Sequence, residues 1–204
     1  MSRRFLTAAS TTPLAAILLT VATVVAPALA LDRAPPEWRI GATVTGAVIQ
    51  VIDGDTLRVR SGGGLADVRL HALDAPEANQ TCARPTGVSF QCGAEATAQM
   101  VDILHATAAA CPSGHMHGTC LAGSGVPISC EVLDLDRRWG RPVARCFLGP
   151  TDVARELVVR GYARASYAQD YVLLAAAARF QKRGLWSGTW IDPAAVRHGR
   201  SVAP

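Results

Sequence analysis

The stretch that decides the fold is TVTGAVIQVIDGDTLRVRSGGGLADVRLHALDAPE, residues 43–77. Its first ten residues are rich in β-branched side chains and stop at Asp53-Gly54-Asp55, which predicts a strand followed by a turn. Residues 56–60 alternate apolar and basic side chains, which predicts a second strand. Three glycines at 62–64 then predict a hairpin loop, and residues 67–73 a third strand. The stretch therefore predicts an antiparallel meander.

The remainder of the chain predicts helices that are separate from the strands. An alanine-rich segment, residues 93–110, predicts the first helix, and residues 128–135 and 142–148 predict two more strands. Thr151 is expected to cap a helix that ends at Gly161, and a last helix is expected over 169–183. Five short strands with segregated helices predict an α+β fold, a five-stranded β-barrel with about three helices.

Length and composition fit one globular domain. The chain has 204 residues, of which 50% are hydrophobic and 18% charged, a balance that excludes a disordered or collagen-like chain. We expect one domain over residues 44–190, with an inserted loop at about 111–125. A leader over 31–43 and a C-terminal tail over 191–204 are expected to flank it, and the mature protein is expected to be a monomer.

The first thirty residues have the pattern of an export signal. Arg3 and Arg4 precede an uncharged run, residues 11–26, and Ala28-Leu29-Ala30 follows it. This pattern predicts a secretory signal peptide over residues 1–30 and a periplasmic or extracellular mature protein. A membrane anchor is the alternative, but the run is shorter than the ~20 residues that a spanning helix needs. No membrane association is expected after cleavage.

Charge is divided unevenly along the mature chain. Residues 31–130 hold six arginines and nine acidic residues, whereas residues 131–204 hold twelve basic and seven acidic residues. An acidic pocket from the first half suits a cation, and a basic wall from the second half suits a polyanion such as nucleic acid. The alternative to such a pocket and wall is charge that is scattered over the surface and solvated.

All six cysteines lie after the predicted signal, and an exported protein meets an oxidising compartment. Six cysteines allow 15 pairings. Their placement in neighbouring pairs favours three disulfides, Cys82 with Cys92, Cys111 with Cys120, and Cys130 with Cys146. The alternative is a zinc site formed by Cys111, His115, His117 and Cys120.

Acidic side chains gather at two predicted turns. Asp53 and Asp55 flank Gly54, and Asp74 and Glu77 flank Ala75-Pro76. A single turn acid is usually a local hydrogen-bond acceptor. If the first and third strands are neighbours, however, Asp55 and Asp74 can share one hard cation of the calcium type, with a backbone carbonyl and waters as further ligands.

Five motifs together resemble the staphylococcal nuclease (thermonuclease) family: DGDT at 53–56, VRL at 68–70, LDAPE at 73–77, WGR at 139–141 and GLW at 184–186. Their order and spacing hold over roughly residues 44–190. The resemblance implies an OB-fold barrel and a calcium-dependent endonuclease that hydrolyses phosphodiester bonds in DNA and RNA. It also implies that Asp55, Asp74 and the backbone carbonyl of Ala75 hold the Ca²⁺.

Further roles come from the same resemblance. Arg69 and Arg141 match the family's two catalytic arginines, whose forked guanidinium groups suit phosphate. Glu77 matches the carboxylate that accepts a proton from the attacking water, and Asp53 is expected behind the metal ligands, where it orders metal-bound water. In a straight strand Arg69 and Asp74, five residues apart, would face opposite sides. The turn before Pro76 is therefore expected to redirect Asp74.

Nucleotide contacts are the part in which the sequence departs from the family. Arg138 and Trp139 are expected to contact a nucleotide. Compared with the common spacing in the family, however, one more residue separates Asp136 from Trp139. Tyr167 matches a position that stacks on a nucleotide, whereas the second such position is Gln169, so stacking is expected to be reduced. The alternative function is a catalytically silent OB-fold module that only binds nucleic acid.

Overall fold

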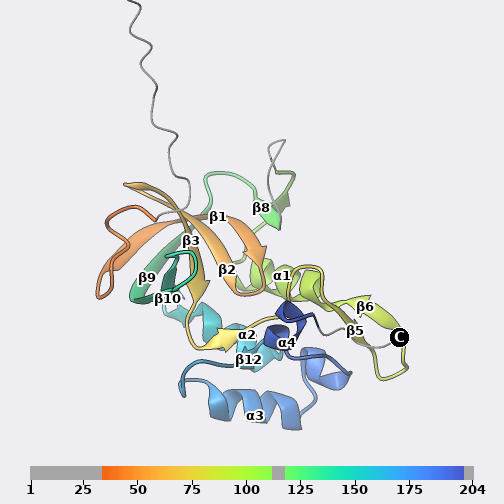
Figure 1. Cartoon of the computed structure of the whole chain (residues 1–204). Helices are drawn as coiled ribbons and strands as arrows, with labels where there is room; N and C mark the ends of the chain where they lie inside the picture. Colours follow the sequence, from red (N-terminus) through yellow and green to blue (C-terminus); the bar gives the residue numbers. More distant parts are fainter. Residues whose placement is uncertain (1–33, 112–117, 200–204) are drawn as a thin grey trace, which may run out of the picture. The chain divides into compact units, whose positions relative to one another are not determined.

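The computed structural model describes residues 34–111 and 118–199, and five of its strands close a β-barrel (Figure 1). These strands are β1 (Thr43–Asp53), β2 (Thr56–Ser61), β3 (Gly64–Leu70), β9 (Val126–Leu135) and β10 (Pro142–Leu148). β1 pairs with β2 and β9, β2 pairs with β3, and β9 pairs with β10, all antiparallel. A parallel pairing of β3 with β10 completes the ring. The predicted α+β fold with an OB-fold-like barrel is confirmed.

The barrel interior follows from alternation along the strands. In β2, Leu57 and Val59 are fully buried, while Arg60 is exposed. In β3, Val68 and Leu70 continue the apolar core, and Arg69 between them points to the other side. The period of two that predicted these strands is therefore the period that fills the core.

The third strand ends earlier than expected. β3 stops at Leu70, and Ala72 takes a left-handed conformation with φ of 64°. β4 (Leu73–Asp74) then leaves the barrel and pairs with β12 (Arg164–Ala165). The redirection of Asp74 thus occurs at His71-Ala72, and not at the turn before Pro76.

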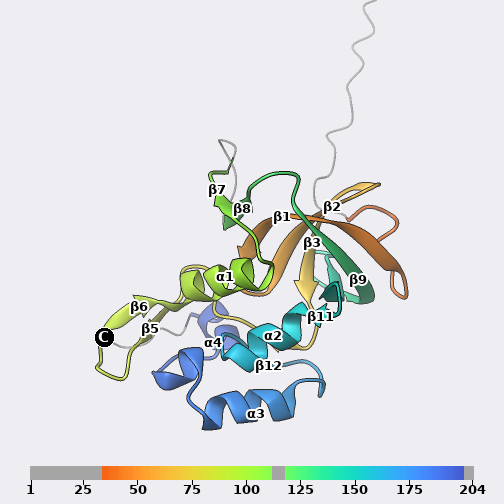
Figure 2. The ribbon, with the colours of Figure 1, turned by 180° about the vertical axis from the view of Figure 1, so that it is seen from behind.

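Two helices pack near the barrel (Figure 2). The second ends at Arg160 before Gly161, as predicted, but the end of the first and the cap of the second differ from the prediction. α1 spans Cys92–Ile103, because His105 adopts φ of 51° and β7 (Ala108–Ala109) pairs with β8 (Thr119–Leu121). The expected helix to residue 110 is therefore wrong at its end. α2 spans Val153–Arg160, and its cap is Asp152, which accepts a hydrogen bond from the backbone N–H of Arg155. Thr151 instead lies in β11 (Thr151–Asp152).

The C-terminal part contains one helix that the sequence analysis missed. α3 spans only Val172–Phe180, and a short 3-10 helix, η1 (Gly184–Ser187), follows it. Within the residues expected to form a tail, α4 (Pro193–Arg197) begins at a cap by Asp192. Beside them, β5 (Thr81–Ala83) and β6 (Ser89–Gln91) form a small hairpin.

The three predicted disulfides are confirmed. Cys82 pairs with Cys92, Cys111 with Cys120, and Cys130 with Cys146. The last joins directly opposed residues of β9 and β10. Because Cys111 and Cys120 are joined to each other, the alternative zinc site is wrong for these two residues, and His115 and His117 lie outside the described residues.

Three disulfides indicate an oxidising compartment, extracellular or periplasmic. The predicted signal peptide lies outside the described residues. Among residues 34–111 and 118–199, the helices are all too short or too polar to cross a membrane.

Candidate active site

The first turn of the site is held in place by a close approach that only glycine allows. Gly54 is buried, and a Cβ built there would lie 2.7 Å from the Cβ of Ala75 and 2.9 Å from that of Ala96 in α1. The absence of a side chain at residue 54 therefore lets the β1–β2 turn pack against the end of β4. This contact brings Asp55 and Asp74 together from separate turns.

One arginine joins these two aspartates. The Nη2 atom of Arg69 lies 2.9 Å from Asp55 Oδ2 and 2.7 Å from Asp74 Oδ1. Asp55 also accepts hydrogen bonds from the Thr56 hydroxyl, at 2.9 Å, and from the Ala75 backbone N–H, at 3.3 Å. Arg69 and Asp74 thus lie on the same side, as the proposed site requires.

Burial controls the ionisation of this cluster. Asp74 is completely buried, and its burial raises the pKa of its carboxyl, against the effect of the neighbouring arginines. Burial, together with the charge of Asp55, raises the pKa of Asp53 to about 7. Asp53 lies directly behind Asp55, whose backbone N–H donates to Asp53 Oδ1 at 3.0 Å. Negative charge is therefore costly here unless a cation compensates it.

A second arginine, Arg197 at the end of α4, completes the cluster and was not predicted. Its Nη1 and Nη2 atoms each lie 3.1 Å from an oxygen of Asp74. Nη1 also lies 2.5 Å from Glu77 Oε1, which connects Glu77 to the aspartates. The only sequence signal was Asp192-Pro193, an N-cap followed by a proline in the first turn, which is typical of a helix start.

Arg141 has a different partner. It lies in the turn between β9 and β10, where its Nε atom bonds Asp136 Oδ2 at 2.7 Å. Asp136 also accepts hydrogen bonds from the backbone N–H groups of Arg138 and Trp139. Among the interactions described for residues 34–111 and 118–199, Arg141 does not contact any of the four carboxylates of the cluster, which are those of Asp53, Asp55, Asp74 and Glu77.

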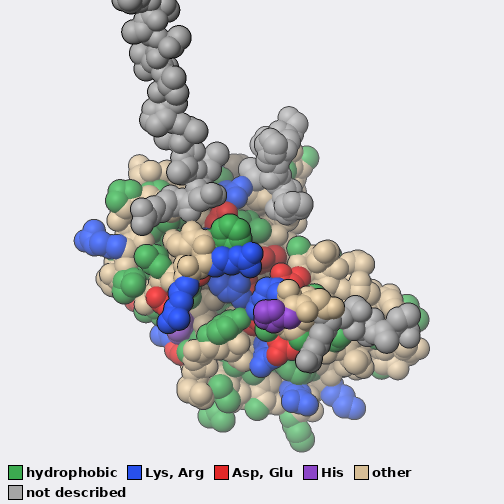
Figure 3. All heavy atoms as spheres, viewed as in Figure 1, with side chains coloured by type: hydrophobic (Ala, Val, Ile, Leu, Met, Phe, Trp, Pro, Cys, Tyr) green, Lys and Arg blue, Asp and Glu red, His purple; other side chains and the backbone are tan. Residues whose placement is uncertain are grey.

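Each of two exposed aromatic residues has an arginine guanidinium packed over its ring. Tyr167 is 70% exposed, lies just after β12, and has the guanidinium of Arg69 5.8 Å from its ring centre. Trp139 is 53% exposed, with the Arg138 guanidinium 4.9 Å from its ring centre. Basic and acidic side chains gather on one face of the molecule, over the region where α4 lies in Figure 1 (Figure 3).

The donor set suits a hard cation, but not in its present arrangement. Two oxygens, Asp55 Oδ2 and Asp74 Oδ1, approach a single nitrogen of Arg69, so one cation can contact both. In the described part of the chain, however, no three His, Cys, Asp or Glu side chains are grouped as a metal site. The residues fit Ca²⁺ if the arginines turn away from the aspartates.

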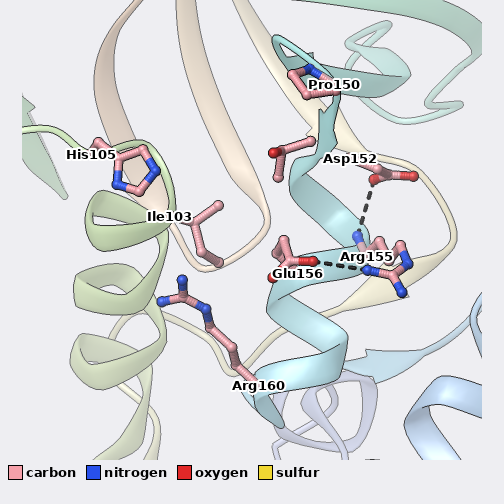
Figure 4. Close-up of a pocket in the computed structure, with 8 residues that line it drawn as sticks. Ile103, His105, Pro150, Asp152, Arg155, Glu156 and Arg160 are labelled. Atoms are coloured by element: carbon pink, nitrogen blue, oxygen red, sulfur yellow. Dashed lines mark hydrogen bonds and ion pairs between the residues drawn. The ribbon is translucent and has the colours of Figure 1, made fainter.

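A separate pocket of about 550 Å³ lies between the end of α1 and α2 (Figure 4). Its charged groups are paired, Arg155 with Glu156 and Arg160 with Asp102. None of the carboxylates of the candidate site lines it. We therefore take the Asp55–Asp74 cluster, and not this pocket, as the candidate site.

Neither the protein-family models nor the curated proteins include a match to this chain.

Proposed function

We propose that this protein is an exported endonuclease that hydrolyses phosphodiester bonds in DNA and RNA with the help of Ca²⁺. One observation carries the proposal: two aspartates from separate turns each lie within 2.9 Å of one nitrogen of Arg69. Such a costly cluster of buried charge is typical of a functional site. The five motifs that resemble the staphylococcal nuclease family include all three residues.

The proposed metal ligands are Asp55, Asp74 and the backbone carbonyl of Ala75, and Asp53 would orient water beside them. Ca²⁺ bound there would supply positive charge to the phosphate oxygens as a Lewis acid. Oxygen ligands of this kind are those that Ca²⁺ prefers. The acidic first half of the mature chain supplies all four residues.

Arg69 and Arg141 are proposed to bind the phosphate and to stabilise the negative charge that grows during hydrolysis. Arg69 is already at the cluster, with its side chain 18% exposed. Arg141 has to exchange Asp136 for the phosphate, or to bind the phosphate with its Nη groups, which have no hydrogen-bond partner among the described residues, while Nε keeps Asp136. Glu77, half-buried beside Asp74, is proposed to accept the proton of the attacking water.

Nucleotide recognition is assigned to the exposed aromatic residues. Tyr167 and Trp139 each present a ring that is more than half exposed and accompanied by an arginine. Stacking on such rings is tolerant of base identity. This tolerance suits an enzyme that accepts both DNA and RNA.

A catalytically silent nucleic-acid-binding module is the second candidate. It is favoured by one observation, the pairing of Asp74 with Arg69 and Arg197, which compensates the buried charge without a metal. The exposed basic and aromatic side chains would suffice for binding alone. The two candidates differ in whether the carboxylates take part in chemistry.

Cleavage of plasmid DNA with Ca²⁺ or with a chelator tests the proposal. We expect Ca²⁺-stimulated cleavage by the wild type and none by Asp74→Asn, which keeps the shape of the side chain but removes a metal ligand. Asp102→Asn is the matched control, because Asp102 pairs with Arg160 away from the cluster. Well-folded wild-type protein that binds DNA without any Ca²⁺-stimulated cleavage would favour the binding module and exclude the enzyme.

A further inference from the structure

Arg197 occupies both carboxylate oxygens of Asp74, which is one of the proposed metal ligands. Its guanidinium spans both oxygens of Asp74, at 3.1 Å each, and reaches Glu77 Oε1 at 2.5 Å. It also donates to the Tyr167 hydroxyl at 3.0 Å. Arg197 lies outside the part of the chain, roughly 44–190, that resembles a known family.

The base of α4 is anchored close to the cluster. The Gln80 side chain donates to the Ile191 carbonyl at 2.8 Å, and Asp192 pairs with Arg164, which lies opposite Asp74 in the β4–β12 pair. Asp192 also caps α4 through the backbone N–H of Ala194. The backbone that carries Arg197 is therefore attached to the same small sheet as Asp74.

The guanidinium itself is freer than its backbone. Arg197 is the last residue of α4, its side chain is 32% exposed, and every anchor named above lies before it in the chain. The side chain can thus rotate into solvent without breaking these anchors. A guanidinium and Ca²⁺ would need the same oxygens of Asp74. Arg69 and Arg197 already both contact Oδ1, so a divalent cation there would be repelled by two guanidinium groups unless Arg197 moves away.

We propose that Arg197 is a tethered cation that neutralises Asp74 and Glu77 when the site is without metal, and that a divalent cation binds only by displacing it. This inference rests on the proposed metal-dependent function. Because the arginine stays attached at the edge of the site, the displaced guanidinium raises the cost of metal binding and sets the Ca²⁺ concentration at which the site fills.

Calorimetric titration with CaCl₂ tests the inference in the full mature chain. We expect Arg197→Ala to bind Ca²⁺ about tenfold more tightly than the wild type, since the contacts of Arg197 with Asp74 and Glu77 no longer have to be broken. Arg155→Ala is the matched control, because it removes an equal charge from a pair with Glu156 on α2. We expect it to change the affinity by no more than about twofold, the scale of screened long-range charge.

Thermal unfolding supplies a readout that does not depend on activity. In chelator, Arg197→Ala is expected to unfold at a lower temperature than the wild type, because Asp74 loses its bidentate partner. Saturating Ca²⁺ is expected to abolish this difference. Arg197→Lys keeps the charge without the fork and is expected to lie between the two.

The possible outcomes separate the inference from the proposed function. Ca²⁺ affinity that is equal or weaker in Arg197→Ala, with plasmid cleavage by the wild type intact, overturns the inference alone. Unchanged affinity with weakened substrate binding would assign Arg197 to the phosphate instead and also overturns it. Absence of Ca²⁺ binding by all three proteins, together with no cleavage, overturns both.

Discussion

Two arginine–carboxylate groups in this protein have opposite surroundings. At the end of the barrel, Arg69 and Arg197 meet Asp74, which is completely buried and whose pKa is raised by that burial. In the β9–β10 turn, Arg141 meets Asp136 near the surface. There burial also opposes ionisation, but hydrogen bonds from Trp139 and Arg141 outweigh it and lower the pKa of Asp136. The same pair of residue types is thus a costly cluster in one place and an ordinary turn support in the other.

The comparison predicts which of two arginines, Arg69 or Arg141, stabilises the fold in addition to its proposed role in phosphate binding. Removing a partner from the buried cluster leaves uncompensated charge in a low dielectric, whereas removing one from the turn leaves a charge that water can reach. Both arginines are proposed to bind phosphate. They should therefore differ in their effect on stability and agree in their effect on cleavage.

Substitution of the two arginines is the largest test of this contrast. We expect Arg69→Ala and Arg141→Ala each to lower the cleavage rate by ~10² or more, the scale of a lost transition-state donor. Arg69→Ala is also expected to cost about 3–5 kcal/mol of unfolding free energy, as for a broken buried pair. Arg141→Ala is expected to cost at most about 1 kcal/mol.

Cleavage kinetics and urea unfolding measure these two effects. Arg58→Ala, which breaks the Arg58–Asp67 pair on neighbouring strands, controls for the loss of a barrel arginine. Equal losses of stability in Arg69→Ala and Arg141→Ala would contradict the distinction between the two groups.

The disulfide that joins β9 to β10 supports the turn that carries Arg141. Replacing Cys130 and Cys146 together by serine is expected to cost about 2–5 kcal/mol, the usual cost of removing a native disulfide. The same change at Cys111 and Cys120, which tie β7 and β8 outside the barrel ring, is expected to cost less. Urea unfolding under non-reducing conditions measures the loss of stability in both double variants. A larger loss for the Cys111 and Cys120 variant would contradict the expectation that the Cys130–Cys146 disulfide stabilises the barrel more.

Gly54 tests how tightly the buried cluster is packed. Gly54→Ala is expected to cost about 1–3 kcal/mol, because the new Cβ would overlap those of Ala75 and Ala96. It should also weaken Ca²⁺ binding, since it separates Asp55 from Asp74. Gly62→Ala is the control, because a Cβ there would meet open space. Chemical unfolding and calorimetry measure the two effects. Unchanged stability and unchanged Ca²⁺ affinity in Gly54→Ala would contradict this packing.

The smallest expected effect is a pH dependence in the turn. The pKa of Asp136 is lowered in the fold, so its charge stabilises the protein above the ordinary Asp value of about 3.9, and this contribution is lost as pH falls through the folded pKa. Asp136→Asn is expected to be less stable than the wild type by up to about 1 kcal/mol at pH 7. Urea unfolding at pH 7 and pH 3 should show a smaller difference at pH 3, and a difference of the same size at both would rule out this cause.

The barrel could be predicted because its signals are local. Leu57 and Val59 alternate with arginines, and Asp53-Gly54-Asp55 stops the strand before them, so pairing and turn follow from a few neighbouring residues. The end of α1 could not be predicted in this way. His105 leaves the helical conformation and Ala108 joins β7, which depends on a partner strand, β8, that helix propensity does not describe.

The candidate site divides in the same manner. The meeting of Asp55 with Asp74 could be predicted, because each follows a recognisable turn. The redirection of Asp74 at His71-Ala72, which brings it to the side of Arg69, could not, because it depends on the left-handed conformation of Ala72. The position of Arg197 could not be predicted either, because it depends on contacts of Ile191 and Asp192 with Gln80 and Arg164. Nothing in the local sequence around Arg197 indicates that the chain returns to β4.

The parallel pairing of β3 with β10 also has a consequence for folding kinetics. Each of these strands belongs to an antiparallel hairpin, β2–β3 or β9–β10, that needs only local contacts. The ring closes where Arg69 meets Val143, and contacts between residues so distant in sequence slow folding, because a long loop has to be ordered before they form. Until then both hairpins present open edges to other chains. We therefore expect barrel closure to limit the folding rate, and newly made molecules to be most prone to association just before it.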